Sequence, residues 1–222
     1  MKKTCVIGWP IAHSRSPIIH NYWLKQHGID SLYEKLPVEP EQLAHFVASL
    51  PESNLLGCNV TIPHKENAFA CADVVDDKVR RLGATNTLYV RDGKVHATNT
   101  DGEGFIASLH QDHPEFKLNG AKAVVLGAGG AARAIIDALL AANVAEVAVI
   151  NRSIDRIVPL QRIFGDKVVA VQPGREPFAL ESADLLVNTT SLGMEHQPPL
   201  TLDVAQLPDQ CLVADIVYTP LK

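Results

Sequence analysis

The sequence predicts an α/β protein with two domains, and three observations point to it. Its 222 residues suffice for one or two domains of ordinary size. Short apolar strands alternate with amphipathic helices through the first half, an order that favours a mainly parallel sheet. The second half contains a strand, a glycine-rich turn, a helix and a strand within about 30 residues, which is the unit of a Rossmann-like domain.

Composition narrows the possible partners. Charged residues make up 20% of the chain and hydrophobic residues 46%, as in ordinary globular proteins, and the net charge of −5 disfavours nucleic acid or an anionic membrane as partner. Four scattered cysteines without a C-x-x-C pair suggest free thiols of a reducing compartment. The apolar run that stops at Pro10 is too short for a signal peptide, and no run reaches membrane-spanning length. We therefore expect a cytoplasmic protein.

The first strand is predicted over residues 4–8, and a polar loop follows it. Ser16 suits the N-cap of the next helix, Pro17 suits its first position, and Gly28 ends it. Ser14 and Ser16 flank Arg15, so both hydroxyls could face one cavity. The alternative is that Ser16 only caps the helix.

A second strand (32–38), an amphipathic helix (41–50) and a third strand (55–60) come next. Pro63 breaks the third strand because it has no N–H to donate, and a helical run over 66–72 follows. Lys65 thus lies at a strand-to-helix switch, where a lysine can exchange a proton if its surroundings tune it. The alternative is an ordinary solvated lysine.

Further helices and strands complete the first half. A helix is predicted over 74–82, closed by Gly83, and Asp92-Gly93 predicts a hairpin between strands 88–90 and 94–97. Asp101 precedes a helix that runs to Leu109 and is either its cap or a catalytic carboxylate at a strand end. The polar stretch 111–120 is a candidate junction, and its His110-x-x-His113 pair lacks a third ligand, so we expect no metal.

The clearest motif lies between a strand over 121–126 and a helix over 134–142. Gly127, Gly129 and Ala132 form G-x-G-x-x-A, and a further strand covers 147–150. The glycines permit a tight turn, and the helix N-terminus offers N–H groups to a diphosphate. This arrangement favours a dinucleotide site over a purely structural turn.

The end of strand 147–150 indicates which dinucleotide binds. Arg152 stands 25 residues after Gly127, whereas the first acidic residue is Asp155. Since arginine suits a 2′-phosphate and an acid suits the free ribose hydroxyl, we predict NADP. The alternative is that Arg152 is a solvated charge. Strands over 168–171, 184–188 and 212–218 and a polar loop over 189–194 follow.

Several stretches together resemble the shikimate dehydrogenases in family order. These are Val6-Ile7-Gly8, His13-Ser14-Arg15-Ser16-Pro17, Asn59-Val60-Thr61-Ile62-Pro63-His64-Lys65, Gly83-Ala84-Thr85-Asn86-Thr87, Asn99-Thr100-Asp101-Gly102, Gly127-Ala128-Gly129-Gly130-Ala131, Asn151-Arg152, Asn188-Thr189-Thr190-Ser191-Leu192-Gly193-Met194 and Asp215-Ile216-Val217-Tyr218-Thr219-Pro220. The resemblance implies NADPH-dependent, reversible reduction of 3-dehydroshikimate to shikimate in aromatic amino acid biosynthesis. It also implies a substrate-binding and catalytic domain over 1–101 and a Rossmann-like NADP-binding domain over 102–222.

The resemblance assigns roles to individual residues. Lys65 and Asp101 would be the catalytic pair: the ammonium of Lys65 would protonate the alkoxide left by hydride transfer, and Asp101 would orient and balance its charge. The substrate would be held by Ser14, Ser16, Thr61, Asn86 and Tyr218. The cofactor would contact Asp77, Gly127, Ala128, Gly129, Gly130, Ala131, Asn151, Arg152, Ser153, Arg156, Thr190, Met194 and Ile216.

Alternatives remain open. Family chains usually continue past the Tyr-x-Pro segment into a Met-Leu-x-x-Gln-type motif and further helices, which this sequence lacks. We therefore expect a truncated or naturally short chain whose first domain exposes apolar surface. A dehydrogenase for quinate or another hydroxy acid, or an inactive NADP-binding protein, would fit the same frame, although Ser16 favours shikimate over quinate. We expect a monomer or a homodimer.

Overall fold

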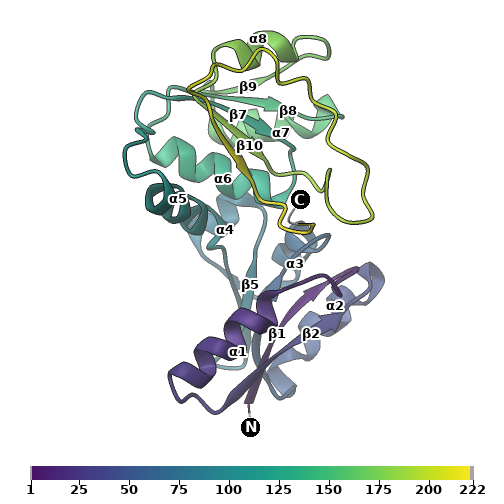
Figure 1. Ribbon diagram of the computed structural model, residues 1–222. Helices are drawn as coiled ribbons and strands as arrows, with labels where there is room; N and C mark the ends of the chain where they lie inside the picture. Colours follow the sequence, from purple (N-terminus) through teal and green to yellow (C-terminus); the bar gives the residue numbers. More distant parts are fainter. Residues whose placement is uncertain (1, 221–222) are drawn as a thin grey trace. The chain divides into compact units, whose positions relative to one another are not determined.

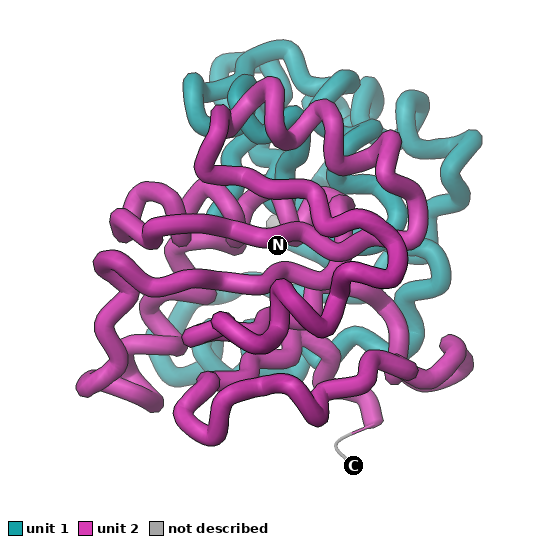
Figure 2. The backbone as a smooth tube through the Cα atoms, turned by 90° about the horizontal axis from the view of Figure 1, so that it is seen from above, with its two compact units in different colours: residues 1–100 teal, residues 101–222 magenta. Residues whose placement is uncertain are grey.

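The computed structural model describes residues 2–220 and divides the chain into two compact units (Figure 2). Unit 1 comprises residues 1–100 and unit 2 comprises residues 101–222. The candidate junction at 111–120 therefore lies inside unit 2. Each unit has its own sheet, with helices packed on it (Figure 1).

Unit 1 contains a six-stranded mixed sheet in the order β2-β1-β3-β5-β6-β4. Its strands are β1 (Lys2–Gly8), β2 (Ser31–Pro37), β3 (Leu55–Val60), β4 (Val74–Val75), β5 (Thr87–Arg91) and β6 (Lys94–Thr98). β1 pairs in parallel with β2 and β3, whereas β5 pairs antiparallel with both β3 and β6. Asp92 (φ 53°) and Gly93 (φ 70°) close the β5–β6 hairpin, which confirms the predicted turn.

The helices of unit 1 are α1 (Ser16–Gln26), α2 (Leu43–Ser49), α3 (Lys65–Cys71) and α4 (Asp77–Leu82), with 3-10 turns η1 (Pro40–Gln42) and η2 (Leu50–Glu52). Alternate strand residues face opposite sides of the sheet. Cys5 and Ile7 pack on one side in the main core of the unit, together with residues of α2, α3 and α4. Val6 and Tyr33 pack on the other side with Leu24 of α1.

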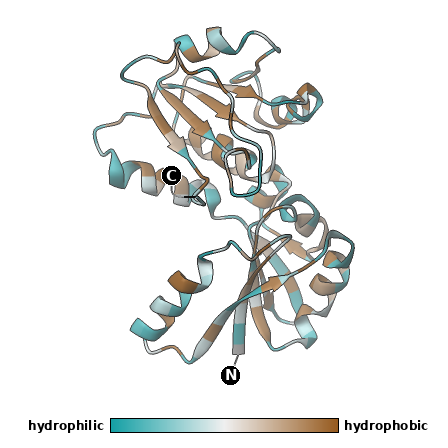
Figure 3. Cartoon of the chain, turned by 45° about the vertical axis from the view of Figure 1, so that its right-hand side comes forward, coloured by the Kyte–Doolittle hydropathy of each residue, from teal (hydrophilic) through white to brown (hydrophobic). Residues whose placement is uncertain are grey.

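Helix α1 buries none of its residues. Ile18, Ile19, Tyr22 and Trp23 are between 47% and 72% exposed. Unit 1 therefore does expose apolar side chains, on this helix and elsewhere, as at Ile29 and Ile62. By contrast, the three central strands of the unit 2 sheet (Lys122–Leu126, Glu146–Ile150 and Leu185–Asn188) are apolar along most of their length (Figure 3) and are mostly buried.

Two local predictions in unit 1 were wrong. Val74 and Val75 form a strand beside β6 instead of opening a helix, and the helix begins after Asp76, whose Oδ1 accepts from the N–H of Val79 at 2.6 Å. Ser16 is not an N-cap: Arg15 occupies that position without a side-chain cap, and Ser14 Oγ accepts from the N–H of Ser16 at 3.3 Å.

Unit 2 contains a five-stranded, fully parallel sheet in the order β11-β10-β7-β8-β9. Its strands are β7 (Lys122–Leu126), β8 (Glu146–Ile150), β9 (Val168–Ala170), β10 (Leu185–Asn188) and β11 (Leu212–Asp215). The strand order reverses direction between β7 and β10, which makes this point the topological switch of a doubly wound sheet. The fold is α/β with a Rossmann-like second unit, as predicted.

The helices of unit 2 are α5 (Asp101–Asp112), α6 (Gly130–Ala141), α7 (Val158–Phe164) and α8 (Glu176–Glu181), with a 3-10 turn η3 (Ile154–Arg156). Leu109 of α5, Ile136 of α6 and Leu160 of α7 share one core, while Leu180 of α8 belongs to a second. α5 packs tightly on α6, since a Cβ on Gly102 would lie 2.5 Å from the carbonyl oxygen of Ala134. No helix within residues 2–220 is long and apolar enough to cross a membrane.

Candidate functional site

The segment after β3 places Lys65 by backbone hydrogen bonds. The N–H of Thr61 donates to the carbonyl of Ile7 at 3.0 Å, and the N–H of Thr85 donates to the carbonyl of Lys65 at 2.9 Å. His64 is fully buried and its Nε2 lies 2.8 Å from the carbonyl oxygen of Val38, so it anchors the chain just before Lys65. Lys65 is consequently the first residue of α3, at the strand-to-helix switch the sequence predicts.

Gly8, at the end of β1, lets Thr61 approach. A Cβ on Gly8 would lie 2.7 Å from Thr61 Cγ2 and 2.9 Å from the carbonyl oxygen of Ile62. Such contacts are shorter than packed side chains tolerate, so a larger residue would displace this segment. The loop after β1 then brings Ser14 and Ser16 together, with the hydroxyl of Ser14 donating to Ser16 Oγ at 3.3 Å.

Asn86, the last residue before β5, is held on both sides of its amide. Its Oδ1 accepts from Thr87 Oγ1 at 2.9 Å and from the N–H of Thr100 at 3.1 Å. Its Nδ2 donates to Thr100 Oγ1 at 3.0 Å. Asn86 is 9% exposed, so a buried amide is kept in one orientation beside the motif that carries Lys65.

Asn59, which the sequence analysis quoted only as part of a motif, completes this polar group. Its Oδ1 accepts from Tyr33 Oη at 2.6 Å, and its Nδ2 donates to Thr87 Oγ1 at 3.1 Å. The signal in the sequence was an amide inside an otherwise apolar strand. Asn86 and Asn59 are thus joined through Thr87.

The predicted catalytic pair is divided between the units, with Lys65 in unit 1 and Asp101, the first residue of α5, in unit 2. Asp77, tentatively linked to the cofactor, opens α4 with a side chain that is 97% exposed and accepts from Arg80 at 3.3 Å. Tyr218 lies in unit 2, beyond the end of β11 and not inside the strand predicted over 212–218.

The glycine-rich turn of unit 2 lies at the switch between β7 and β10. Gly127 has φ 105°, and a Cβ there would lie 2.8 Å from Thr189 Oγ1, which itself donates to the carbonyl of Leu126 at 2.6 Å. A Cβ on Gly129 would meet nothing within 4 Å. Gly129 is the N-cap of α6, so the turn leaves open space beside the N–H groups that begin this helix.

Asn188, which sequence reasoning did not single out as a site residue, organises the loop after β10. Its Oδ1 accepts from the N–H of Thr190 at 3.0 Å and from Thr190 Oγ1 at 2.7 Å. Its Nδ2 donates to both carboxylate oxygens of Asp215, at 3.1 and 3.2 Å. Thr190 and the end of β11 are thereby fixed to the same buried amide. Ile216 lies at this edge of the sheet as well, because its N–H donates to the carbonyl of Asn188 at 3.2 Å.

The loop after β8 lies beside the glycine-rich turn, because the N–H of Gly127 donates to the carbonyl of Ile150 at 2.8 Å. Asn151 Nδ2 closes this loop on the carbonyl of Ser153 at 2.7 Å. Arg152 and Arg156 are exposed next to it. Within the described part of the chain, no cluster of three or more acidic, histidine or cysteine side chains could hold a metal ion.

Comparison with known proteins identifies both halves of the chain. Residues 6–88 match the family described as "Shikimate dehydrogenase substrate binding domain", and residues 108–198 match "Shikimate / quinate 5-dehydrogenase". A protein of Paracoccus denitrificans named shikimate dehydrogenase (NADP(+)) is 48% identical over 97% of this chain and 77% of its own length. One from Rhodopseudomonas palustris is 48% identical over 100% of this chain and 79% of its own length.

Solved structures agree. The chain superposes on shikimate dehydrogenase from Aquifex aeolicus with a TM-score of 0.89 and 31% identity, covering 98% of this chain and 79% of that one. It superposes on the Thermus thermophilus enzyme in complex with NADP(H) and shikimate with a TM-score of 0.87 and 35% identity, covering 99% and 80%. The resemblance stated from the motifs is confirmed: the chain belongs to the shikimate dehydrogenase family.

Proposed function

We propose that this protein is an NADP-dependent shikimate dehydrogenase that reversibly reduces 3-dehydroshikimate to shikimate in aromatic amino acid biosynthesis. The observation that carries the proposal is the 48% identity, over nearly the whole chain, to proteins named for this activity. Unit 1 would be the substrate-binding and catalytic domain and unit 2 the NADP-binding domain. Asp101, which the sequence analysis placed at the end of the first domain, begins unit 2.

The residues of unit 2 fit a dinucleotide. The open space at Gly129 and the first N–H groups of α6 would receive the diphosphate, together with Ala128, Gly130 and Ala131. Arg152 and Arg156 would pair with the 2′-phosphate beside Asn151 and Ser153, because guanidinium groups bind phosphate through two N–H donors. Thr190, Met194 and Ile216 would line the nicotinamide end, and Asp77 would add a contact from unit 1. When bound, NADPH supplies the hydride.

Unit 1 would bind the substrate and manage the proton. Ser14, Ser16, Thr61 and Asn86, with Tyr218 of unit 2, would hold its carboxylate and hydroxyl groups. As the ketone carbon is reduced, its oxygen gains negative charge and then a proton; the Lys65 ammonium would polarise the oxygen first and supply that proton afterwards. Asp101 would orient Lys65 and balance its charge.

Quinate is the second candidate substrate, since one of the two matching families is described as shikimate / quinate 5-dehydrogenase. Ser16 favours shikimate, because quinate-active members of the family tend to carry threonine there. For the remaining properties, we propose a cytoplasmic enzyme that is a monomer or a homodimer, which sedimentation at several protein concentrations would distinguish.

The deciding experiment follows NADPH absorbance during shikimate oxidation by this 222-residue chain, with NAD and quinate as parallel reactions. We expect turnover with NADP and shikimate and much weaker turnover in the parallel reactions. Equal turnover of quinate would change the substrate assignment. NADP binding without any turnover would instead identify a dinucleotide-binding protein that is not a working enzyme.

A further inference from the structure

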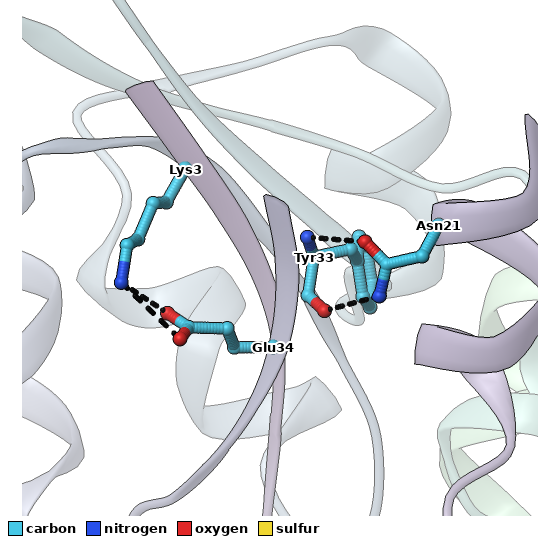
Figure 4. Close-up of polar contacts among 4 residues, drawn as sticks. All are labelled: Lys3, Asn21, Tyr33 and Glu34. Atoms are coloured by element: carbon cyan, nitrogen blue, oxygen red, sulfur yellow. Dashed lines mark hydrogen bonds and ion pairs between the residues drawn. The ribbon is translucent and has the colours of Figure 1, made fainter. Parts of the chain in front are cut away.

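Tyr33 is held firmly by α1 at the open edge of the unit 1 sheet. β2 is an edge strand, and Asn21 satisfies its backbone there: Nδ2 donates to the Tyr33 carbonyl and Oδ1 accepts from the Tyr33 N–H, both at 2.9 Å (Figure 4). The ring of His20 stacks on that of Tyr33 with centroids 4.1 Å apart and planes 4° apart. Tyr33 is 4% exposed, so the position of its hydroxyl is fixed by the surrounding residues.

The hydroxyl of Tyr33 lies at the cluster of polar side chains formed by Asn59, Thr87 and Asn86. Tyr33 Oη donates to Asn59 Oδ1 at 2.6 Å, passing over β1, which lies between β2 and β3. Asn59 Nδ2 donates to Thr87 Oγ1 at 3.1 Å, and Thr87 Oγ1 donates to Asn86 Oδ1 at 2.9 Å. Three successive hydrogen bonds therefore lead from the edge strand to Asn86.

The three hydrogen bonds all run in the same direction, from Tyr33 towards Asn86. A protonated phenol donates to Asn59, so the amide of Asn59 must turn its oxygen to Tyr33 and its NH2 to Thr87. Thr87 then receives a hydrogen bond and sends its single proton to Asn86. Without the phenol, Asn59 Oδ1 loses its donor, and only the bonds of Nδ2 to Thr87 Oγ1 at 3.1 Å and to the backbone carbonyl of Asn86 at 3.4 Å hold the amide. The proton of Thr87 would then be directed to Asn86 less strictly.

The protonation state of Tyr33 suits this role. Burial raises the pKa of the Tyr33 phenol well above its ordinary value, and the nearby thiols of Cys5 and Cys58 raise it further. The Ser16 hydroxyl acts in the opposite direction and lowers the pKa, as the smallest of these effects. Tyr33 is thus a constant donor to Asn59 at neutral pH.

We propose that Tyr33 is a positioning residue for substrate binding: its hydroxyl fixes the amide of Asn59, and the amide of Asn59 in turn directs the hydroxyl proton of Thr87 to Asn86 Oδ1, the same oxygen that the N–H of Thr100 holds. This inference rests on the proposed function, in which Asn86 and Ser16 hold the substrate. Tyr33 itself would touch neither substrate nor cofactor.

The test compares Tyr33→Phe with Tyr89→Phe. Tyr89 lies on the same sheet, is stacked on His96 with ring centroids 5.1 Å apart, and is 37% exposed. We expect Tyr33→Phe to raise KM for shikimate about tenfold, as the loss of one buried hydrogen bond implies. Its kcat and its KM for NADP should change less than about twofold, and Tyr89→Phe should match wild type throughout.

A second pair of variants keeps the proposal testable if Tyr33→Phe folds poorly. Thr87→Val removes the relay hydroxyl and should raise KM for shikimate, while Thr87→Ser restores the hydroxyl and should return KM close to wild type. Wild-type KM in Tyr33→Phe, or an equal loss in Thr87→Ser and Thr87→Val, would overturn the inference alone. A wild-type protein without shikimate oxidation would overturn the inference together with the proposed function.

Discussion

Lys65 carries the proposed proton transfer, and its position as the first residue of α3 makes the proposal testable. Lys65→Ala removes the donor but leaves the backbone bond to Thr85 intact. We expect kcat for shikimate oxidation to fall about 10²- to 10⁴-fold, the usual contribution of a positioned acid or base, with a much smaller change in KM. Lys94→Ala, on the exposed hairpin, is the matched control. Unchanged kcat in Lys65→Ala would remove Lys65 from the mechanism.

Arg152 should decide the choice of cofactor. Its exposed guanidinium follows β8 beside the glycine-rich turn, and a charged hydrogen bond contributes about 1.5–3 kcal/mol. Arg152→Ala should therefore weaken NADP binding about 10- to 100-fold and leave NAD binding nearly unchanged, as measured by titration calorimetry. Arg162→Ala, an exposed arginine on α7, controls for the loss of net charge. A preference for NADP that survives Arg152→Ala would refute the assignment.

The residues that sequence reasoning found and missed differ in what defines them. Lys65, Gly127 and Arg152 stand at breaks between predicted elements, so local pattern alone locates them. Tyr33 and Asn188 gain their roles from partners on other strands, Asn59 and Asp215. Such pairs depend on which strands are neighbours and in what register, and a single sequence does not state either.

Helix α1 contributes a pH-dependent term to the stability of unit 1. Burial against Tyr33 lowers the pKa of His20 from its ordinary value of 6.5, so the folded protein favours the neutral ring. Below pH 6.5 the unfolded chain binds the proton more readily, and the free energy of unfolding falls as the pH decreases through the folded-state pKa. This stabilisation is fully present only above pH 6.5.

The variant His20→Phe keeps an aromatic ring on Tyr33 but cannot titrate. We measure the free energy of unfolding by urea denaturation at pH 8 and pH 5, about 1.5 units either side of the ordinary histidine pKa. We expect the decrease in this free energy from pH 8 to pH 5 to be smaller in His20→Phe than in wild type. His27→Gln, at the C-cap of the same helix, should behave like wild type. An identical pH dependence in His20→Phe and wild type would exclude His20 as the source.

Short elements escaped prediction for identifiable reasons. β4 has two residues and pairs with β6, far along the chain, so its valines looked like the start of a helix. α7 and α8 have seven and six residues and carry a proline in the first turn, which reads as a helix breaker unless the start is already known. β3, β7 and β10 were predicted within one residue, because each is a mostly apolar run bounded by polar residues, by glycine or by a proline.

Strand order was the part of the fold that sequence could not supply. The second unit was recognised from its glycine-rich turn, but the order β11-β10-β7-β8-β9 follows from the way the crossovers wind outward from β7 in both directions. That winding places the turn after β7 next to the loop after β10, where Gly127 meets Thr189. In unit 1, an antiparallel hairpin pairs with the parallel strands, so alternation of helices and strands predicted only part of the sheet.

Each unit builds its hydrophobic core from its own residues, and this suggests two unfolding transitions. The cores of unit 1 consist of residues between Cys5 and Ala97. The buried members of the unit 2 cores lie between Leu109 and Val187, and the partly buried ones between Phe105 and Ala214. Regions with separate cores often unfold as separate cooperative units. Both tryptophans, Trp9 and Trp23, lie in unit 1, so tryptophan fluorescence reports that unit specifically.

NADP should therefore raise the unfolding midpoint of unit 2 and leave the unfolding midpoint of unit 1 unchanged. A ligand at 100 times its Kd stabilises the unit it binds by about 2.7 kcal/mol, which raises the midpoint of a domain of this size by several degrees. We expect NADP to raise one calorimetric transition while the midpoint seen by tryptophan fluorescence stays constant, and shikimate to raise the fluorescence midpoint instead. A single transition that NADP raises equally in both measurements would show that the two units unfold together, because stabilising unit 2 would then protect the core of unit 1 as well.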